Sequence, residues 1–378
     1  FHSNGINVIM DVVYNHLDSA GDFCYNKLVP YYFTRFWDQN GDWSQICNGS
    51  GVGNDFATQR SMARNYIVDS LSWWVEEYHV DGFRFDAAKY IYYGEAERNT
   101  DFWDWYMAQL RSIKPDVYSV AEVWDGDGVT IPYNSSTNCF NFTMSQVGGQ
   151  IAQTAANGDP GVMARYIESY LQQIRAQRSD AMLCSFIANH DMDRTAGFLP
   201  ISNGRAFVGA NLNILTPGSP FIYYGEEIGL RGSRGGANTD ANRRLAMLWG
   251  DGDTVKDPIG ADYDSAGRNG TVADQLPNGK SLYNHYKKLI AIRQANPEIA
   301  YGEFKALELE GTKAGGFLST WQGKTVCVLH NTSTAETEID LSQIPGFNFE
   351  SFTAVGLGSA KIEGTILTLD GQTSVVLR

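Results

Sequence analysis

The chain has 378 residues, of which 43% are hydrophobic, so it is long enough to bury a sizeable core in one large domain plus a small one. Its formal net charge of -14 argues against a nucleic-acid partner, because binding phosphates requires a basic face. No run of about 18 apolar residues is present, so the sequence predicts no membrane span.

Cysteine usage does not indicate a disulfide scaffold. The chain has five cysteines, an odd number that is low for its length. Cys24 and Cys47 could pair within one loop, whereas Cys139, Cys184 and Cys327 lie in strand-like stretches and are expected to be buried thiols.

Apolar stretches that end in polar residues recur along the chain. The first, residues 5–16, ends in Asn15 and His16. The same design returns at residues 80–86, 117–122, 181–191 and 220–226, and a weaker strand is expected at 138–142. Near-continuous apolar strands are typical of a parallel sheet that is buried on both faces.

Helical patterns lie between these strands. Apolar residues near helical spacing predict helices at 60–78, 160–177, 205–215 and 281–294, and Thr100 is expected to cap a further helix that runs to about residue 112. Alternation of strand and helix predicts right-handed βα units. The sequence therefore predicts six strands, each with a helix after it.

Polar residues at the ends of the predicted strands indicate a (β/α)8 TIM barrel, in which functional sites lie at the C-terminal mouth. Two further βα units are then expected upstream of Phe1, because six strands alone would leave open sheet edges. A doubly wound open sheet is the alternative, but it would need a glycine-rich phosphate loop after an early strand, and none is present.

Two departures from the alternation suggest the domain organisation. Residues 17–58 are too many for a βα loop and are rich in Gly, Asn, Asp and aromatic residues, which predicts an inserted subdomain at the site face. Towards the C-terminus, residues 325–330 and 365–369 resemble short alternating strands between glycine-rich turns. We therefore expect a barrel domain at 1–298 and an antiparallel β-sandwich at 299–378.

The most informative stretch is residues 82–86. Phe83 and Phe85 alternate with Arg84 and Asp86, and because strand side chains alternate between faces, the two charged groups share one side. A carboxylate held ionised by a neighbouring guanidinium suits a nucleophile. A salt bridge at a strand end, with no role in catalysis, explains the same pattern.

Four short segments carry a resemblance to a known family. Residues 11–16 (DVVYNH), 82–89 (GFRFDAAK), 122–124 (EVW) and 186–191 (FIANHD) resemble the four motifs of the α-amylase family of glycoside hydrolases, in the same order and at similar intervals. The resemblance covers the chain from Phe1 to about Leu248, and the C-terminal tail matches that family's β-domain in kind.

The resemblance implies three catalytic carboxylates. Asp86 would be the nucleophile that forms a covalent glycosyl-enzyme, and Glu122 the general acid and then the base. Asp191 would hold hydroxyl groups of the distorted sugar and stabilise positive charge at the anomeric carbon. A nucleophilic mechanism implies retention, with the Asp86 and Glu122 carboxyls about 5–5.5 Å apart. The alternative for any one of them is capping of the helix that follows, and Asp11 is expected to be structural.

The same resemblance implies the residues that bind substrate: Arg84 beside the nucleophile, His16 and His190 on the sugar ring, and Lys89 on the reducing side. Ala87 and Lys89 are similar to enzymes that cut α-1,4 bonds. Residues 48–55 and 60–70 are instead similar to pullulanases, which cut α-1,6 branches. Aromatic residues near the predicted rim are expected either to stack on sugar rings or to pack in the core of the inserted subdomain, namely Tyr31, Tyr32, Trp37, Trp43, Tyr92, Tyr93 and Trp124.

Calcium is the cofactor that the resemblance implies. The family binds Ca²⁺ between the inserted subdomain and the barrel, and oxygen ligands are available here in Asn15, Asp55 and a main-chain carbonyl near Tyr90. The family more often has His where Tyr90 stands. Zinc is not expected, because the cysteines and histidines lack ligand spacing.

The expected protein is thus a retaining glycosidase that cuts α-1,4 bonds of starch, glycogen or maltooligosaccharides. A pullulanase-like α-1,6 debranching or transglycosylating enzyme is one alternative, and a catalytically inactive carbohydrate-binding relative is another. We expect a monomer with an α-glucan as its substrate, no nucleic-acid partner and an extracellular location, because the substrate is polymeric.

Overall fold

The computed structural model describes residues 1–17, 30–36, 46–92, 96–156, 158–253, 255–262, 269–307, 309, 314–344, 346 and 348–378. Four residues named above lie outside these ranges, namely Cys24, Trp37, Trp43 and Tyr93, as does the side chain of Tyr31. The predicted Cys24–Cys47 pairing therefore also lies outside the described residues. Contacts divide the chain into two compact units, Phe1–Phe140 with Gln173–Ala181 and Asn141–Gln172 with Met182–Arg378. Each unit is described separately below.

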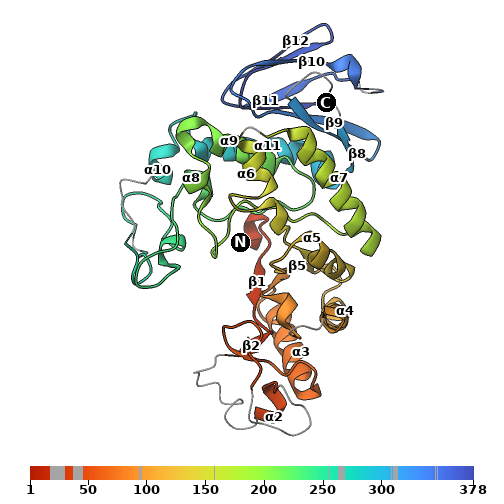
Figure 1. Cartoon of the computed structure of the whole chain (residues 1–378), viewed down its shortest axis with the longest axis vertical. Helices are drawn as coiled ribbons and strands as arrows, with labels where there is room; N and C mark the ends of the chain where they lie inside the picture. Colours follow the sequence, from red (N-terminus) through yellow and green to blue (C-terminus); the bar gives the residue numbers. More distant parts are fainter. Residues whose placement is uncertain are drawn as a thin grey trace. The chain divides into compact units, whose positions relative to one another are not determined.

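The first unit contains a four-stranded parallel sheet of order β1-β4-β5-β6 (Figure 1). Its strands are β1 (Ile9–Val12), β4 (Gly82–Phe85), β5 (Tyr118–Ala121) and β6 (Asn138–Cys139). The register pairs Asp11 with Arg84 and Phe85 with Ala121. These strands confirm the first three predicted ones, and the strand expected at 138–142 is shortened to two residues.

Helices α3 (Ser61–Glu76) and α4 (Ala96–Ile113) pack with this sheet. Phe85 of β4 is fully buried, and its ring stacks on Trp103 of α4 at a centroid distance of 4.7 Å. The helix expected to start at Thr100 begins at Ala96 instead. Thr100 therefore lies inside the helix, where its hydroxyl donates to the Glu97 carbonyl at 2.9 Å and caps nothing.

The inserted segment adds a small antiparallel pair to the first unit. Strand β2 (His16–Leu17) pairs with β3 (Asn54–Asp55), and α2 (Pro30–Phe33) precedes two isolated bridges. One bridge joins Thr34 to Phe56. The unit is completed by α5 (Asp127–Thr130) and the 3₁₀ turns η1 (His2–Asn4), η2 (Ala88–Tyr90) and η3 (Ile131–Ser135).

The strands predicted at 181–191 and 220–226 do not form, although both segments lie in the second unit and run side by side. The amide of Ser219 donates to the Leu183 carbonyl at 2.8 Å, and that of Phe221 to the Ser185 carbonyl at 2.7 Å. Pro220 has no N–H, so it interrupts the row of donors that this segment would offer to a neighbouring strand. The described residues thus hold four parallel strands where the sequence predicts six.

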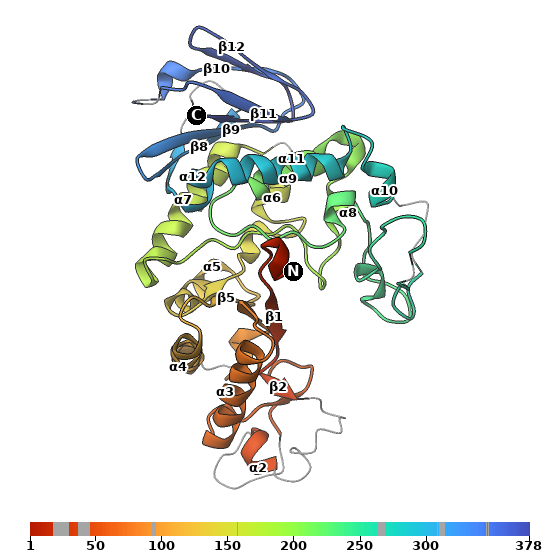
Figure 2. The same cartoon turned by 180° about the vertical axis from the view of Figure 1, so that it is seen from behind.

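Helices make up much of the rest of the second unit. They are α6 (Gln150–Ala155), α7 (Pro160–Gln177, of which the part up to Gln172 belongs to this unit), α8 (Thr195–Phe198), α9 (Arg205–Ile214), α10 (Val272–Gln275), α11 (Leu282–Ala295) and α12 (Pro297–Tyr301). The prediction for α7 is confirmed at both ends, and those for α9 and α11 to within one residue. Helices α9 and α11 lie side by side in both views (Figure 1 and Figure 2). No helix in the described ranges is long and apolar enough to cross a membrane.

The C-terminal part of the second unit is an antiparallel β-sandwich, as predicted. One sheet has the order β11-β14-β9-β8-β7 and the other β10-β13-β12. The strands are β7 (Glu303–Leu307), β8 (Ala314–Trp321), β9 (Lys324–Asn331), β10 (Thr337–Asp340), β11 (Phe352–Gly356), β12 (Ala360–Glu363), β13 (Ile366–Leu369) and β14 (Thr373–Leu377). Leu329 and Val375 of the larger sheet share a core with Leu367 of the smaller one.

Polar contacts join the sandwich to the helices of its unit. Asn211 of α9 donates to the Val355 carbonyl at 3.1 Å and to Ser374 Oγ at 2.8 Å.

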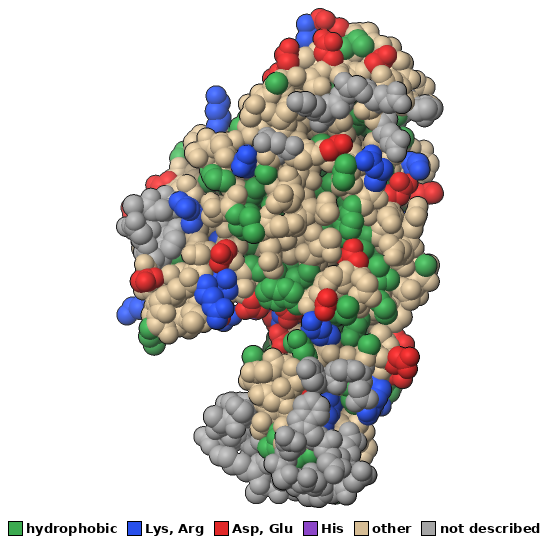
Figure 3. All heavy atoms as spheres, viewed as in Figure 1, with side chains coloured by type: hydrophobic (Ala, Val, Ile, Leu, Met, Phe, Trp, Pro, Cys, Tyr) green, Lys and Arg blue, Asp and Glu red, His purple; other side chains and the backbone are tan. Residues whose placement is uncertain are grey.

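On the outer surface, acidic side chains gather over β10 and β12 (Figure 3), where Glu338 and Glu363 are exposed. This part of the surface contributes to the net negative charge of the chain.

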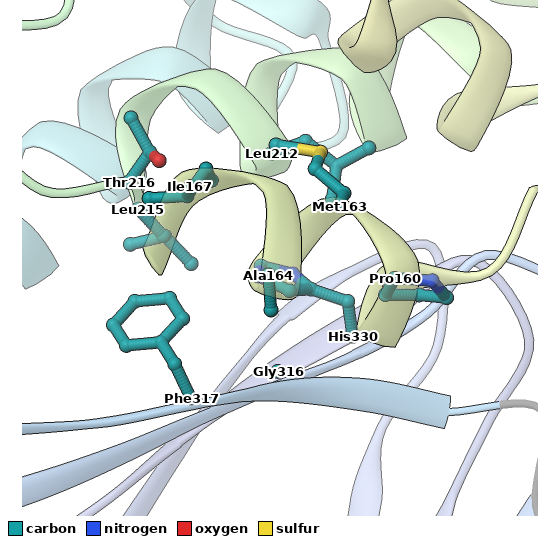
Figure 4. A pocket seen from close by; sticks show the side chains of 10 residues that line it. All are labelled: Pro160, Met163, Ala164, Ile167, Leu212, Leu215, Thr216, Gly316, Phe317 and His330. Atoms are coloured by element: carbon teal, nitrogen blue, oxygen red, sulfur yellow. The ribbon is translucent and has the colours of Figure 1, made fainter. Parts of the chain in front are cut away.

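A small apolar cavity lies between α7, α9 and strand β8 (Figure 4). Its lining includes Met163, Ile167, Leu215, Phe317 and His330. Burial lowers the pKa of His330 to about 4, and its Nδ1 lies 2.7 Å from Ser374 Oγ. None of the predicted catalytic or substrate-binding residues lines this cavity, so it is a packing space within the second unit.

Candidate active site

Arg84 is the centre of the candidate site in the first unit. Its Nη1 donates to Asp86 Oδ1 and to Asp11 Oδ1, each at 2.7 Å, and its Nη2 donates to Glu122 Oε2 at 2.6 Å. The parallel register explains the convergence, because β4 lies between β1 and β5 and Glu122 follows the last residue of β5. The prediction that Arg84 and Asp86 share one side of the strand is confirmed.

The electrostatic balance at this centre favours charged groups. Burial of Arg84 would by itself lower its pKa, but the negative charges of Glu122, Asp11 and Asp86 together raise that pKa above its ordinary value. The guanidinium therefore stays charged across the physiological pH range. A fixed cation between two carboxylates holds both in place by charge-assisted hydrogen bonds.

The turn after Asp86 adds a main-chain donor to the site. Ala87 has a left-handed conformation, with φ of 41°, which is uncommon for a residue with a side chain. Its N–H donates to Glu122 Oε2 at 3.1 Å, and the next amide, of Ala88, donates to the Glu122 main-chain carbonyl at 2.8 Å. Glu122 is 6% exposed, so this turn and Arg84 together position a largely buried carboxylate.

His16 is held beside the same turn by its neighbour. Asn15 is buried, and its Nδ2 donates to the carbonyls of Asp86 at 3.4 Å and Ala87 at 3.1 Å. Its Oδ1 in turn contacts His16 Nδ1. The structure therefore brings His16 into the neighbourhood of Asp86, as the prediction of a shared sugar ring requires.

Lys89 reaches the segment that follows Glu122. Its Nζ donates to the Trp124 carbonyl at 2.8 Å and to Asp125 Oδ2 at 3.1 Å. The Trp124 side chain is 40% exposed. The Gly126 amide and then Lys89 hold the pKa of Asp125 below its usual range. Sequence reasoning missed Asp125, although its position directly after Glu122 and Trp124 was the available signal.

Asp191 and His190 lie in the second unit and have partners of their own. Asp191 Oδ1 accepts from Arg244 Nη2 at 2.6 Å, and its Oδ2 lies 3.1 Å from His190 Nε2. The hydrogen bond with His190, together with Arg244, lowers the pKa of Asp191 despite its partial burial. The neighbouring Arg243 donates to the Asp191 carbonyl at 2.8 Å. Neither arginine was predicted, because residues 243–244 carry no periodic pattern.

The structure thus forms two clusters from the predicted residues. The first cluster lies in the first unit, where Arg84 contacts both Asp86 and Glu122. Asn15 links His16 to the turn after Asp86, and Lys89 lies one turn further along the chain. Asp191 and His190 meet in the second unit. Convergence of all three carboxylates on one substrate stays a prediction.

The residues predicted to bind calcium are a poor fit for that ion. Asp55 is 1% exposed; its Oδ1 accepts from the Gly49 amide at 2.9 Å, and its Oδ2 lies 3.8 Å from Arg35 Nη1. The Asn15 amide is engaged by His16 and by the turn after Asp86. A guanidinium so close to the carboxylate opposes binding of a second cation. Oxygen ligands are present, but Arg35 already supplies the positive charge that neutralises the Asp55 carboxylate.

Comparisons with known proteins identify the family that this chain resembles. Residues 37–302 match the family model described as "Alpha amylase, catalytic domain". The chain is 25% identical over 410 residues to Alpha-amylase 3 of Dictyoglomus thermophilum, covering 100% of this chain and 77% of that protein. It is 39% identical over 124 residues to the pullulanase of Bacillus subtilis, covering 33% of this chain and 16% of that one.

Among solved structures, the chain is similar to Eubacterium rectale Amy13B, with a TM-score of 0.85 and 27% identity over 100% of this chain and 79% of that one. The chain spans 46% of Alpha-amylase SusG of Bacteroides thetaiotaomicron, to which it is 29% identical over 332 residues. These neighbours imply a TIM barrel with a C-terminal antiparallel sheet domain. With its match to the catalytic-domain model over most of its length, the chain belongs to the alpha-amylase family of glycoside hydrolases.

Proposed function

We propose that this protein hydrolyses α-1,4-glucosidic bonds of starch, glycogen or maltooligosaccharides with retention of configuration. The observation that supports the proposal most directly is the binding of Asp86 and Glu122, on adjacent strands, by the single guanidinium of Arg84. Two carboxylates that flank one bond are what double displacement at a glycosidic centre requires.

In the proposed first step, the Asp86 carboxylate attacks the anomeric carbon while the protonated Glu122 carboxyl gives its proton to the departing glycosidic oxygen. A glycosyl ester on Asp86 and a free alcohol result. In the second step, Glu122 takes a proton from water, the oxygen attacks the anomeric carbon, and the ester bond to Asp86 breaks. Arg84 and the Ala87 amide both donate to Glu122, and so hold its carboxyl group in place during both steps.

Asp191 completes the proposed machinery. Its carboxylate, ionised through His190 and Arg244, would hold hydroxyl groups of the distorted sugar and stabilise positive charge at the anomeric carbon. This role requires Asp191 to face Asp86 at the C-terminal mouth of a closed (β/α)8 barrel. We propose that residues 1–298 contribute to such a barrel, with an inserted subdomain at 17–58 and the sandwich domain at 299–378.

The preference for α-1,4 bonds rests on Lys89, which lies one turn after the nucleophile and contacts the segment beside Glu122. Similarity to a pullulanase over 124 residues favours α-1,6 cleavage as the second candidate. Product analysis separates the two. Shortening of linear maltooligosaccharides supports the α-1,4 proposal, whereas maltotriose from pullulan with linear oligomers left intact refutes it.

Replacement of Glu122 by Gln tests the mechanism. The variant keeps the shape of the side chain but cannot transfer a proton, so we expect kcat to fall by about 100-fold or more on maltooligosaccharides, with an unchanged Tm. A fluorinated glucosyl fluoride that slows hydrolysis of the ester should add its sugar mass to the peptide that carries Asp86. Unchanged turnover in the variant, or the label on another residue, would remove the assignment.

A binding protein without catalysis is the competing class. Asp86, Glu122 and Asp191 are all present, and a protein that only binds sugar has no need of two carboxylates on one guanidinium. Saturable binding of maltooligosaccharides by the wild type with no release of reducing ends would favour this class over the enzyme.

A further inference from the structure

Arg35 and Asp55 form a buried ion pair within the inserted segment. Arg35 and Asp55 are 5% and 1% exposed, and Arg35 Nη1 lies 3.8 Å from Asp55 Oδ2. Among the described residues, neither of these two atoms has a hydrogen-bond partner. An unpaired charge at this depth would be strongly destabilising, so each group depends on the other.

Further contacts fix the Arg35 guanidinium in place. Its Nη2 donates to Thr58 Oγ1 at 2.6 Å and to the Phe56 carbonyl at 3.0 Å, while its Nε donates to Gln59 Oε1 at 3.1 Å. The group also lies over the ring of Tyr92, 4.4 Å from the ring centroid. These partners belong to β3 and its continuation and to the turn that follows the catalytic motif.

The main chain of Arg35 is tied to the same strand. Its N–H donates to the Asp55 carbonyl at 2.9 Å, and its carbonyl accepts from the Cys47 amide at 3.0 Å. The Asp55 amide in turn donates to the Cys47 carbonyl at 2.8 Å. Residues 34–36, 46–47 and 54–56 are therefore held together by both backbone and side chain, with the guanidinium at their centre.

A divalent cation on Asp55 would conflict with this arrangement. Calcium binds carboxylate oxygens at about 2.4 Å, so an ion on Oδ2 would lie no more than about 6 Å from the Arg35 guanidinium nitrogen. In a buried site such a repulsion is weakly screened. The opposite Oδ1 already accepts from the Gly49 amide.

We propose that the Arg35 guanidinium supplies the positive charge that neutralises Asp55, and that the inserted segment is held to the strand-end turn without a calcium ion at this position. Arg35 is thus a structural cation built into the chain. The proposal does not depend on the catalytic assignment, because its readouts are stability and metal content.

The test compares the wild type with Arg35→Gln, Asp55→Asn and the double variant. Thermal unfolding is measured in EDTA and in millimolar CaCl₂, with MgCl₂ as the ionic-strength control. We expect the wild-type Tm to agree within about 1 °C in all three. Arg35→Gln should lower the Tm by about 5 °C or more, because it leaves a buried carboxylate unpaired, and CaCl₂ should restore part of that loss.

The double variant removes both charges, so its Tm should lie closer to the wild type than that of either single variant. This keeps the test decisive if Arg35→Gln alone does not fold. Lys114→Gln is the matched control, because Lys114 pairs at 3.2 Å with Asp116, whose side chain is 83% exposed, and its loss should change the Tm by no more than about 2 °C.

Metal analysis of the dialysed protein gives an independent readout. We expect Asp55→Asn to leave the calcium content of the wild type unchanged, whatever other sites the chain holds. A calcium ion that the wild type retains and Asp55→Asn loses would overturn the proposal. So would a wild-type Tm that falls in EDTA and recovers with CaCl₂ but not with MgCl₂.

Discussion

Replacing Arg84 with Lys tests the arrangement at the centre of the candidate site. The guanidinium uses two nitrogens to contact Asp11, Asp86 and Glu122 at 2.6 to 2.7 Å. An ammonium is a single point charge on a flexible stem and cannot reproduce the planar fork that holds groups on both neighbouring strands. The Lys variant should keep the positive charge but lose the contact to Asp86 or to Glu122.

The size of the loss follows from the contact that is removed. A hydrogen bond to a charged group contributes about 1.5–3 kcal/mol. If the transition state needs both carboxylates in position, the lost contact lowers kcat/KM by about 10- to 150-fold, since about 1.4 kcal/mol corresponds to a factor of ten. Because the positive charge is kept, the variant should still fold, with a Tm that is lower by a few degrees.

The assay is the initial rate of reducing-end release from maltoheptaose, with Tm measured in parallel. Asp11→Asn is the matched control: its carboxylate also contacts Arg84, but its side chain is 57% exposed, so we expect less than about a fivefold change. If Arg84→Lys kept kcat/KM within threefold of the wild type, or lost no more than Asp11→Asn, the reasoning about a shared guanidinium would be refuted.

Two further outcomes are expected. Burial lowers the pKa of His330 in the folded state from 6.5 to about 4. Between these two pH values the unfolded chain binds a proton at His330 that the folded protein does not bind. The free energy of unfolding should therefore be unaffected by this group above pH 6.5 and fall by about 1.4 kcal/mol per pH unit towards pH 4. His330→Gln should flatten the acid dependence of the free energy of unfolding, and equal slopes would contradict this. Lys89→Met should lower kcat/KM on maltoheptaose by about tenfold and shift the product lengths, because a charge-assisted contact beside Glu122 is lost; an unchanged product pattern would argue against a substrate contact.

Local patterns in the sequence predicted the elements that local physics determines. The alternation in residues 82–86 placed Arg84 and Asp86 on one side of a strand, and the apolar spacing of residues 160–177 gave both ends of α7. Each of these depends on the period of a single element. The antiparallel sandwich was also predicted from local patterns, because its short strands alternate apolar and polar residues and are separated by glycine-rich turns.

Contacts between elements could not be predicted from those patterns. That Arg84 also reaches Glu122 depends on the register between β4 and β5, which the sequence of either strand does not contain. Arg244 was missed because it lies in a segment without secondary structure. The strands expected at 181–191 and 220–226 do not form, because apolar character alone does not distinguish a strand from an extended segment without regular pairing.

The left-handed turn at Ala87 has a consequence for how the site tolerates sequence change. The donor that it presents to Glu122 is a peptide N–H, which every amino acid except proline carries. A substitution at this position therefore keeps the donor itself, but bulky and β-branched side chains would strain the left-handed turn that aims it at Glu122. Position 87 is thus limited to small residues and to Asn or Asp, and a larger residue there would disturb the orientation of Glu122 without removing the N–H that contacts it.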